Sequence, residues 1–189
     1  MTDGFFYSGG GSDAGLFGSP DFVTSTGFLF SPDGFVAADN VDDDTSVTTT
    51  DRLEVRITAK PGLTLDKITI EEQGDYSILG PGSVQVTGAL FLTGPGLGSG
   101  VGDLLTTNPG MPITTVGSGL YDGMVMIDLP DGITEVVLVY NNTLQADSEG
   151  GAALIQKKTA GLEINVVIPE PATMGLLALG APMLMRRRR

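Results

Sequence analysis

Carboxylates are the side chains of this sequence that could do chemistry. The chain has 23 Asp and Glu residues but no Cys and no His. Nucleophilic catalysis by a Ser-His-Asp or Cys-His arrangement is therefore excluded, and so are disulfides and Cys-ligated zinc. The acidic residues leave two chemistries to consider, which are cation binding and acid–base catalysis.

The densest group of carboxylates is the run DNVDDD, at residues 39–44. Hard cations such as Ca²⁺ need several oxygen ligands at about 2.3–2.6 Å, and loop carboxylates can supply them. Asp39, Asp42, Asp43 and Asp44 are the candidate ligands, and Ca²⁺ is the one cofactor that the sequence suggests. The run lacks the Asp-x-Asp-x-Asp-Gly spacing and the final Glu of a helix-loop-helix calcium site. Two interpretations stay open: a solvated, charged loop, or the metal site of a calcium-dependent carbohydrate-binding module.

A second group of carboxylates could serve glycoside hydrolysis, which uses a pair of acidic side chains. Glu71, Glu72 and Asp75 lie near a predicted strand end, and Glu54 lies on a neighbouring predicted strand. Adjacent residues of a strand point to opposite faces, so Glu71 and Glu72 cannot form the pair themselves. The chain also has no Trp and only 4 Tyr to stack on sugar rings. We therefore expect a protein that is not an enzyme.

The charge is strongly uneven along the chain. The whole sequence carries a formal charge of −13, and four of its ten basic residues are Arg186–Arg189. Without them, six basic residues face 23 acidic ones, so the rest of the chain carries −17. Such a body repels nucleic acid and attracts cations, so no nucleic-acid partner is expected.

The elements that must position these side chains are short strands. Residues 52–58 alternate strictly, with Leu53, Val55 and Ile57 on one face, and Val84 and Val86 repeat the pattern in residues 83–93. Turn residues separate such runs every eight to twelve residues, and no helical period persists before Pro169. The sequence predicts an all-β fold, an antiparallel β-sandwich or jelly-roll-like domain over residues 20–168, after a Gly/Ser-rich segment at 1–19.

Individual strands follow from the same pattern. We expect one strand at 22–30, separate strands at 65–72 and 74–82, short strands within the Gly/Pro/Thr-rich loop 94–119, and a final pair, 152–158 and 162–168, turned at Ala160–Gly161. Residues 136–139 are apolar on both faces, which predicts a central strand. The stretch SGGGSDAG reads as a loop, and turns are expected at 60–62 and 130–132.

The C-terminal tail differs from everything before it. Pro169-Glu170-Pro171 is followed by an uncharged run from Met174 to Met185 and then by Arg186, Arg187, Arg188 and Arg189. As a helix, twelve residues span about 18 Å, against about 30 Å for a hydrocarbon core. Arginines stay on the cytoplasmic side of a membrane. The run therefore predicts a short membrane-inserted helix with the acidic body outside.

These three parts, in this order at the C-terminus, resemble the PEP-CTERM sorting signal of bacterial exported proteins. The resemblance covers residues 168–189. It implies recognition of the Pro-Glu-Pro region and processing of the tail by an exosortase-type membrane enzyme. It also implies export to the cell surface or the extracellular matrix, with a transient membrane anchor, in bacteria that make exopolysaccharide and biofilm. Such proteins normally carry a signal peptide, which the start of this sequence does not show, because it lacks a positive n-region and a long apolar run.

Overall fold

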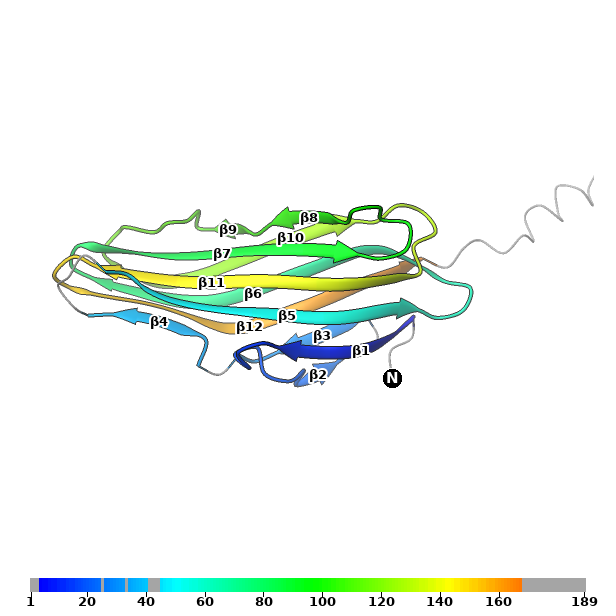
Figure 1. Ribbon diagram of the computed structural model, residues 1–189. Helices are drawn as coiled ribbons and strands as arrows, with labels where there is room; N and C mark the ends of the chain where they lie inside the picture. Colours follow the sequence, from blue (N-terminus) through cyan, green and yellow to red (C-terminus); the bar gives the residue numbers. More distant parts are fainter. Residues whose placement is uncertain (1–3, 25, 33, 41–44, 168–189) are drawn as a thin grey trace, which may run out of the picture.

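The computed structural model describes residues 4–24, 26–32, 34–40 and 45–167, which form two antiparallel sheets packed face to face (Figure 1). The five-stranded sheet has the order β1 (Phe5–Ser12), β5 (Val47–Ala59), β11 (Glu135–Ser148), β7 (Gly82–Thr93) and β8 (Val101–Leu104). The seven-stranded sheet has the order β2 (Phe22–Val23), β3 (Gly27–Phe30), β12 (Ala152–Val167), β6 (Thr64–Leu79), β10 (Gly117–Asp128) and β9 (Thr106–Asn108), with β4 (Val36–Asp39) also on β12. The predicted all-β sandwich is confirmed. The predicted C-terminal helix lies outside the described residues.

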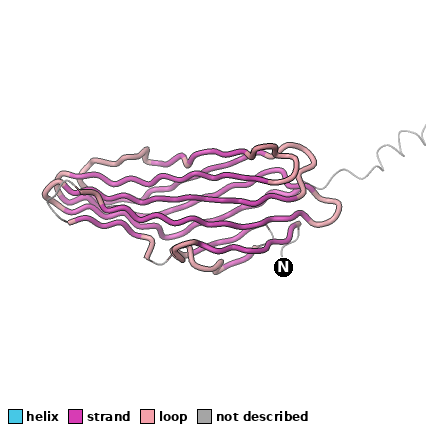
Figure 2. Tube along the Cα trace, viewed as in Figure 1, coloured by secondary structure: helices cyan, strands magenta, loops and turns pink. Residues whose placement is uncertain are grey.

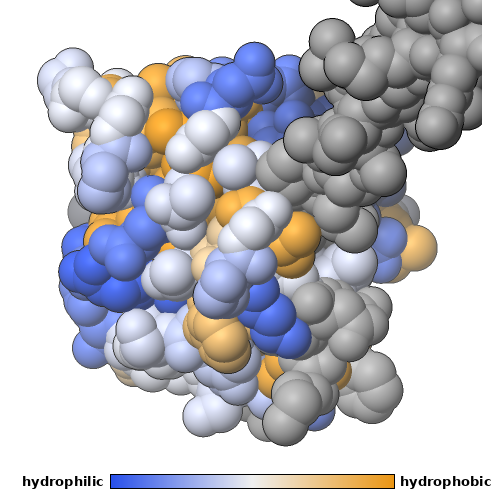
Figure 3. Space-filling view, turned by 90° about the vertical axis from the view of Figure 1, so that its right-hand side faces the viewer, coloured by the Kyte–Doolittle hydropathy of each residue, from blue (hydrophilic) through white to orange (hydrophobic). Residues whose placement is uncertain are grey.

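The long strands alternate between the two sheets. From β5 to β7, and again from β10 to β12, each strand pairs in the sheet opposite its predecessor, so the connections cross at the ends of the sandwich. Gly62 and Gly132 lie in two of these connections with φ of 84° each, which glycine adopts without strain. Both predicted turns are therefore confirmed. Figure 3 shows the end of the sandwich, where apolar and hydrophilic residues are interspersed.

Alternating side chains build the core between the sheets. Leu53, Val55 and Ile57 are at most 2% exposed, and so are Val84 and Val86. Burial of this apolar surface is the main force that holds the two sheets together. The strand that contains residues 136–139 is β11, the middle strand of the five-stranded sheet, so the prediction of a central strand is also confirmed.

Several predicted interruptions are wrong because the chain continues through them. β6 runs unbroken from Thr64 to Leu79, and Gly74 lies inside it. A Cβ on Gly74 would lie 2.4 Å from the Tyr121 ring, so this glycine makes room for a side chain and does not end the strand. β12 likewise continues through Ala160–Gly161. Conversely, the single strand expected at 22–30 is the hairpin of β2 and β3.

The Gly-rich N-terminal stretch is also a strand, against expectation. Phe5–Ser12 pairs with β5, with an irregular register between Gly9 and Gly11. Phe5 and Phe17 are buried in the core. The sandwich therefore takes in residues from Phe5 onward, and not only those after residue 19.

Asp51 fixes this N-terminal segment to β5. Its buried carboxylate accepts hydrogen bonds from the backbone N–H groups of Ala14, Leu16 and Arg52, each at 2.8 Å, and from the Ser12 hydroxyl. Burial alone would raise the pKa of Asp51, but these hydrogen bonds favour the charged form and hold the pKa below its usual value.

Figure 2 shows strands joined by loops throughout the described residues. Within them, no helix has the length and apolar character that a membrane crossing requires.

Candidate functional site

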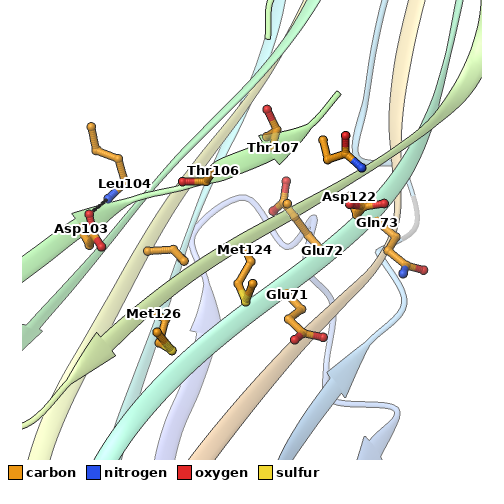
Figure 4. A pocket seen from close by; sticks show the side chains of 13 residues that line it. Glu71, Glu72, Gln73, Asp103, Leu104, Thr106, Thr107, Asp122, Met124 and Met126 are labelled. Atoms are coloured by element: carbon orange, nitrogen blue, oxygen red, sulfur yellow. Dashed lines mark hydrogen bonds between the residues drawn. The ribbon is translucent and has the colours of Figure 1, made fainter. Parts of the chain in front are cut away.

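A groove lies at one side of the sandwich, where the chain passes from one sheet to the other. β8 pairs with β7 in the five-stranded sheet, whereas β9 pairs with β10 in the seven-stranded sheet. Leu105 joins them, and its N–H donates to the carbonyl of Gly88 at 2.9 Å. The resulting groove has a volume of about 610 Å³, with walls from β6, β8, β9 and β10 (Figure 4).

The strand register arranges the outer face of the sheet at the groove in two rows. Met124 on β10 stands opposite Glu71 on β6 and Thr106 on β9. Asp122 on β10 stands opposite Gln73 on β6 and Asn108 on β9. Side chains that are opposite across antiparallel strands share a face and are neighbours. Each row therefore offers polar groups from β6 and β9 on both sides of a β10 side chain.

Four of the lining residues are carboxylates: Glu71, Asp103 and Asp122 are exposed, and Glu72 is buried. No lysine or arginine is among the described lining residues. Asp103 accepts a hydrogen bond from the N–H of Leu104 at 2.8 Å. The basic residues of the described chain pair with groups other than these three exposed carboxylates: Arg52 with Asp13 and Glu54, Arg56 with Glu135, Lys67 with Asp128, Lys157 with buried Glu72, Lys158 with Asp75, and Lys60 over the ring of Phe6. The groove therefore presents a negative surface that the protein's own cations leave uncompensated.

The groove also has an apolar component without aromatic rings. Met124 and Met126 are 50% and 42% exposed, and Leu104 is 69% exposed. Exposed methionine is adaptable in shape and polarizable, so it can pack against varied apolar surfaces. The combination of carboxylates, amides and methionines suits a ligand with both polar groups and apolar faces.

Beneath this surface lies a buried polar cluster built around Glu72. Its Oε2 accepts hydrogen bonds from the Tyr140 hydroxyl at 2.8 Å and from Asn142 Nδ2 at 3.0 Å, and it forms an ion pair with Lys157. The Glu72 and Lys157 side chains are both fully buried. A buried charge of this kind is tolerated only when it is paired and hydrogen-bonded.

Lys157 reaches this position because it shares the inward phase of β12 with buried Ala153 and Ile155. The register of β12 against β6 shifts between Lys157 and Thr159. The Lys157 ammonium lies 5.3 Å and 5.2 Å from the ring centroids of Phe17 and Phe35, which suits a cation–π interaction. Burial lowers the pKa of Lys157, and the neighbouring Glu72 carboxylate opposes that shift. The same burial and the Glu72 charge raise the pKa of Tyr140 well above its usual value.

Three buried polar atoms around this cluster have no hydrogen-bond partner among the described residues: Glu72 Oε1, Asn142 Oδ1 and the Tyr121 hydroxyl. Glu72 is also one of the residues that line the groove. In Figure 4 its side chain extends from β6 toward the strand that carries Thr106 and Thr107. Glu72 Oε1 and Asn142 Oδ1 are acceptors, and buried acceptors without a donor are rare, so these two atoms mark a place where a donor is needed.

The carboxylates considered for glycoside hydrolysis are separated by the fold. Glu71 is exposed and Glu72 is buried, which confirms that they point to opposite faces of the sheet. Glu54 lies on β5 in the other sheet and pairs with Arg52. Asp75 pairs with Lys158 at 3.3 Å. The structure thus brings only Glu71 and Glu72 of this group to the groove.

Of the four predicted calcium ligands, Asp39 alone lies within the described residues. Its carboxylate is buried at the end of β4 and accepts a hydrogen bond from the N–H of Ser148 at 2.8 Å. Asp42, Asp43 and Asp44 lie outside the described residues, as do Pro169–Pro171 and the rest of the tail. In the part of the chain that is described, no group of three or more acidic residues is placed to hold a metal ion. Calcium binding therefore stays a prediction.

Sequence reasoning missed Asp103, Asp122 and Lys157. Asp122 shares its strand phase with Met124 and Met126, opposite to buried Tyr121 and Val125, so the alternation of β10 held the signal. Lys157 shares its strand phase with buried Ala153 and Ile155, so the alternation of β12 held its signal too.

No protein-family model matches the sequence, and no curated protein matches it. Among solved structures, the chain is similar to TmCBM61 in complex with beta-1,4-galactotriose, with 10% identity, 87% of this chain and 88% of that chain covered, and a TM-score of 0.27. It is similar to a Family 16 Carbohydrate Binding Module-2, with 11% identity, coverage of 77% and 79%, and a TM-score of 0.25. It is also similar to Eiger TNF from S. frugiperda, with 10% identity, coverage of 77% and 94%, and a TM-score of 0.32. At these TM-scores none of the likenesses supports an argument about this chain.

Proposed function

We propose that this protein is an exported, non-enzymatic bacterial surface or matrix protein whose β-sandwich binds extracellular polysaccharide in the groove between β8, β9 and β10. The observation that carries the binding role is the pair of rows on the outer face, where carboxylate, amide and hydroxyl groups lie beside exposed methionine. Sugars present many hydroxyl groups together with apolar C–H faces. An open groove with both kinds of surface can bind a chain of sugars along its length.

The contacts of Glu72 favour binding over cleavage. Hydrolysis needs two carboxyl groups that face one substrate from either side. Glu72 is bound by Lys157, Tyr140 and Asn142 in the interior, so it cannot turn outward to join Glu71. We therefore assign the groove to recognition.

The sorting part of the proposal is supported by the sequence of the tail. Pro169, Glu170 and Pro171 precede the run Met174–Met185 and Arg186–Arg189, the order found in PEP-CTERM signals. In this proposal an exosortase-type enzyme recognises Pro-Glu-Pro while the apolar run holds the chain in the membrane. The acidic body then lies on the outer side, where the polysaccharide is.

Binding is tested by titrating the full chain with exopolysaccharide purified from a producing bacterium. The Asp122→Asn variant should bind more weakly than the wild type. The matched Asp131→Asn variant changes an exposed carboxylate in the turn before β11, outside the groove, and should bind normally. Equal binding by all three proteins would contradict the groove assignment, and no binding by the wild type would contradict the function.

Sorting is tested by mass spectrometry of the protein recovered from the surface of a producing bacterium. We expect the arginines to be absent from the mature protein. Replacing Pro169, Glu170 and Pro171 by Ala should leave an uncleaved, membrane-bound form. Recovery of the wild-type protein with Arg189 intact would overturn this part of the proposal.

A further inference from the structure

We infer that the ligand of the groove is a cationic polysaccharide, a polymer of amino sugars whose amines are free and protonated. The inference rests on the proposed function and adds the chemical class of the sugar. The first observation is the unpaired negative charge of the groove. Glu71, Asp103 and Asp122 line the groove and take part in none of the ion pairs of the described chain.

The distribution of basic residues makes this imbalance specific to the groove. The outer face of the other sheet has a hollow of about 370 Å³ beside the Gly9–Gly11 irregularity, lined in part by Glu54 and Arg56. There Glu54 pairs with Arg52, and Arg56 pairs with Glu135. The negative charge of the carboxylates on that face is therefore neutralised within the protein, whereas the exposed carboxylates of the groove are free to bind an external cation.

The position of the three carboxylates favours an extended polycation over a single metal ion. Glu71, Asp103 and Asp122 come from three strands, β6, β8 and β10. Asp122 stands opposite Gln73, one row along from Glu71, and successive same-face positions of a strand are about 6.6 Å apart. A ligand with positive groups repeated along a chain can reach carboxylates in both rows, whereas one ion cannot coordinate them together.

The inner part of the groove, where Glu72 stands opposite Gly123 and Gly123 opposite Thr107, gives a second, independent indication of a ligand that donates hydrogen bonds. Glu72 lines the groove with a fully buried side chain, and its Oε1 has no partner among the described residues. An acceptor of this kind is satisfied by a donor that enters from the groove, directly or through a water molecule. Protonated amines and hydroxyls are both donors. An acidic polysaccharide would instead meet the carboxylates with like charge and be repelled.

Methionines complete the fit to a sugar and not only to a polycation. Met124 lies in the same row as Glu71, and Met126 lies one same-face position further along β10. Their exposed side chains can pack on the C–H faces of sugar rings while the carboxylates bind the amines. A flexible cationic polypeptide has no such rigid apolar faces.

The test is a titration of the full chain with a β-1,4-linked glucosamine hexamer, at a mildly acidic pH that keeps the amines protonated. The N-acetylated hexamer and oligolysine of equal charge are the comparisons. We expect the glucosamine hexamer to bind and the other two to bind at least ten-fold more weakly. Glu71→Gln and Asp122→Asn should each weaken binding about two- to five-fold, as expected for exposed charge pairs. Added NaCl should weaken binding further.

The variants Glu54→Gln and Asp131→Asn are the controls and should bind as the wild type does, and thermal unfolding checks that all variants are folded. Equal binding of the glucosamine and N-acetylated hexamers would overturn the cationic class but keep the proposed function. Equal binding of oligolysine would overturn the sugar. Binding to none of these, together with binding to the exopolysaccharide, would overturn the inference alone, and binding to no polysaccharide would overturn both.

Discussion

Glu71 and Glu72 are neighbours in the sequence, but the fold gives them opposite roles. Glu71 faces outward from β6 without an ion pair among the described residues, whereas Glu72 faces inward and is held by Lys157, Tyr140 and Asn142. The alternation of a β-strand alone produces this difference. It teaches that the inner face of the seven-stranded sheet mainly stabilises the sandwich, while the outer face carries most of the groups that are free to bind a ligand.

The largest expected effect comes from breaking the inner ion pair on its cationic side. Lys157→Met leaves the Glu72 charge buried without its partner, so we expect the free energy of unfolding to fall by about 3–5 kcal/mol. The double variant Lys157→Met, Glu72→Met removes both charges and should recover much of that loss. Urea unfolding followed by circular dichroism measures both. A double variant no more stable than the single one would contradict the assignment of the loss to an unpaired charge.

Asp51 is a second buried carboxylate and can be compared with Glu72. Backbone N–H groups, and not a lysine, stabilise its charge. Asp51→Ala leaves several donors of residues 14–17 without an acceptor, and we expect a loss of about 2–3 kcal/mol. The folded-state pKa of Asp51 is lowered. Its stabilisation is therefore present above the unfolded-state value of about 3.9 and is lost as the pH falls through the folded-state pKa.

The pH dependence of Asp51 is checked by measuring unfolding from neutral pH into the acid range. The wild type should lose more stability than Asp51→Ala as the acid range is entered. Parallel curves for the two proteins would show that Asp51 titrates alike in the folded and unfolded states, contrary to the geometry.

The two faces also differ in the space around their glycines. A Cβ on Gly74 would lie 2.1 Å from the carbonyl oxygen of Gln156, whereas a Cβ on Gly161 meets nothing closer than 3.9 Å. We expect Gly74→Ala to cost about 1–3 kcal/mol, as overpacking does, and Gly161→Ala to be tolerated. Differential scanning calorimetry of the two variants provides the comparison. Equal melting temperatures would mean that the sheet relaxes around Gly74.

Much of the fold could be predicted because alternation is a local signal. The alternation of Leu53, Val55 and Ile57 predicted β5. The same alternation predicted that Glu71 and Glu72 point to opposite faces. Glycine suggested turns at three places where the chain forms a strand. Gly74 makes room for a close approach, whereas Gly161 and Gly9–Gly11 have room around them and are held in strands by pairing with their neighbours. The groove could not be predicted, since it depends on Leu105 carrying the chain from one sheet to the other. The inward position of Lys157 follows from the alternation of Ala153 and Ile155, but its pairing with Glu72 depends on the packing of β12 beside β6.

The smallest structural change gives the most direct test of the account. Glu71→Gln and Glu72→Gln are the same substitution one residue apart, and chemical unfolding of the two variants beside the wild type is the measurement. We predict that Glu71→Gln stays within about 0.5 kcal/mol of the wild type, as exposed substitutions do, and that Glu72→Gln loses about 3–5 kcal/mol. Equal losses, or a larger loss for Glu71→Gln, would contradict the division of this sheet into a stabilising inner face and a binding outer face.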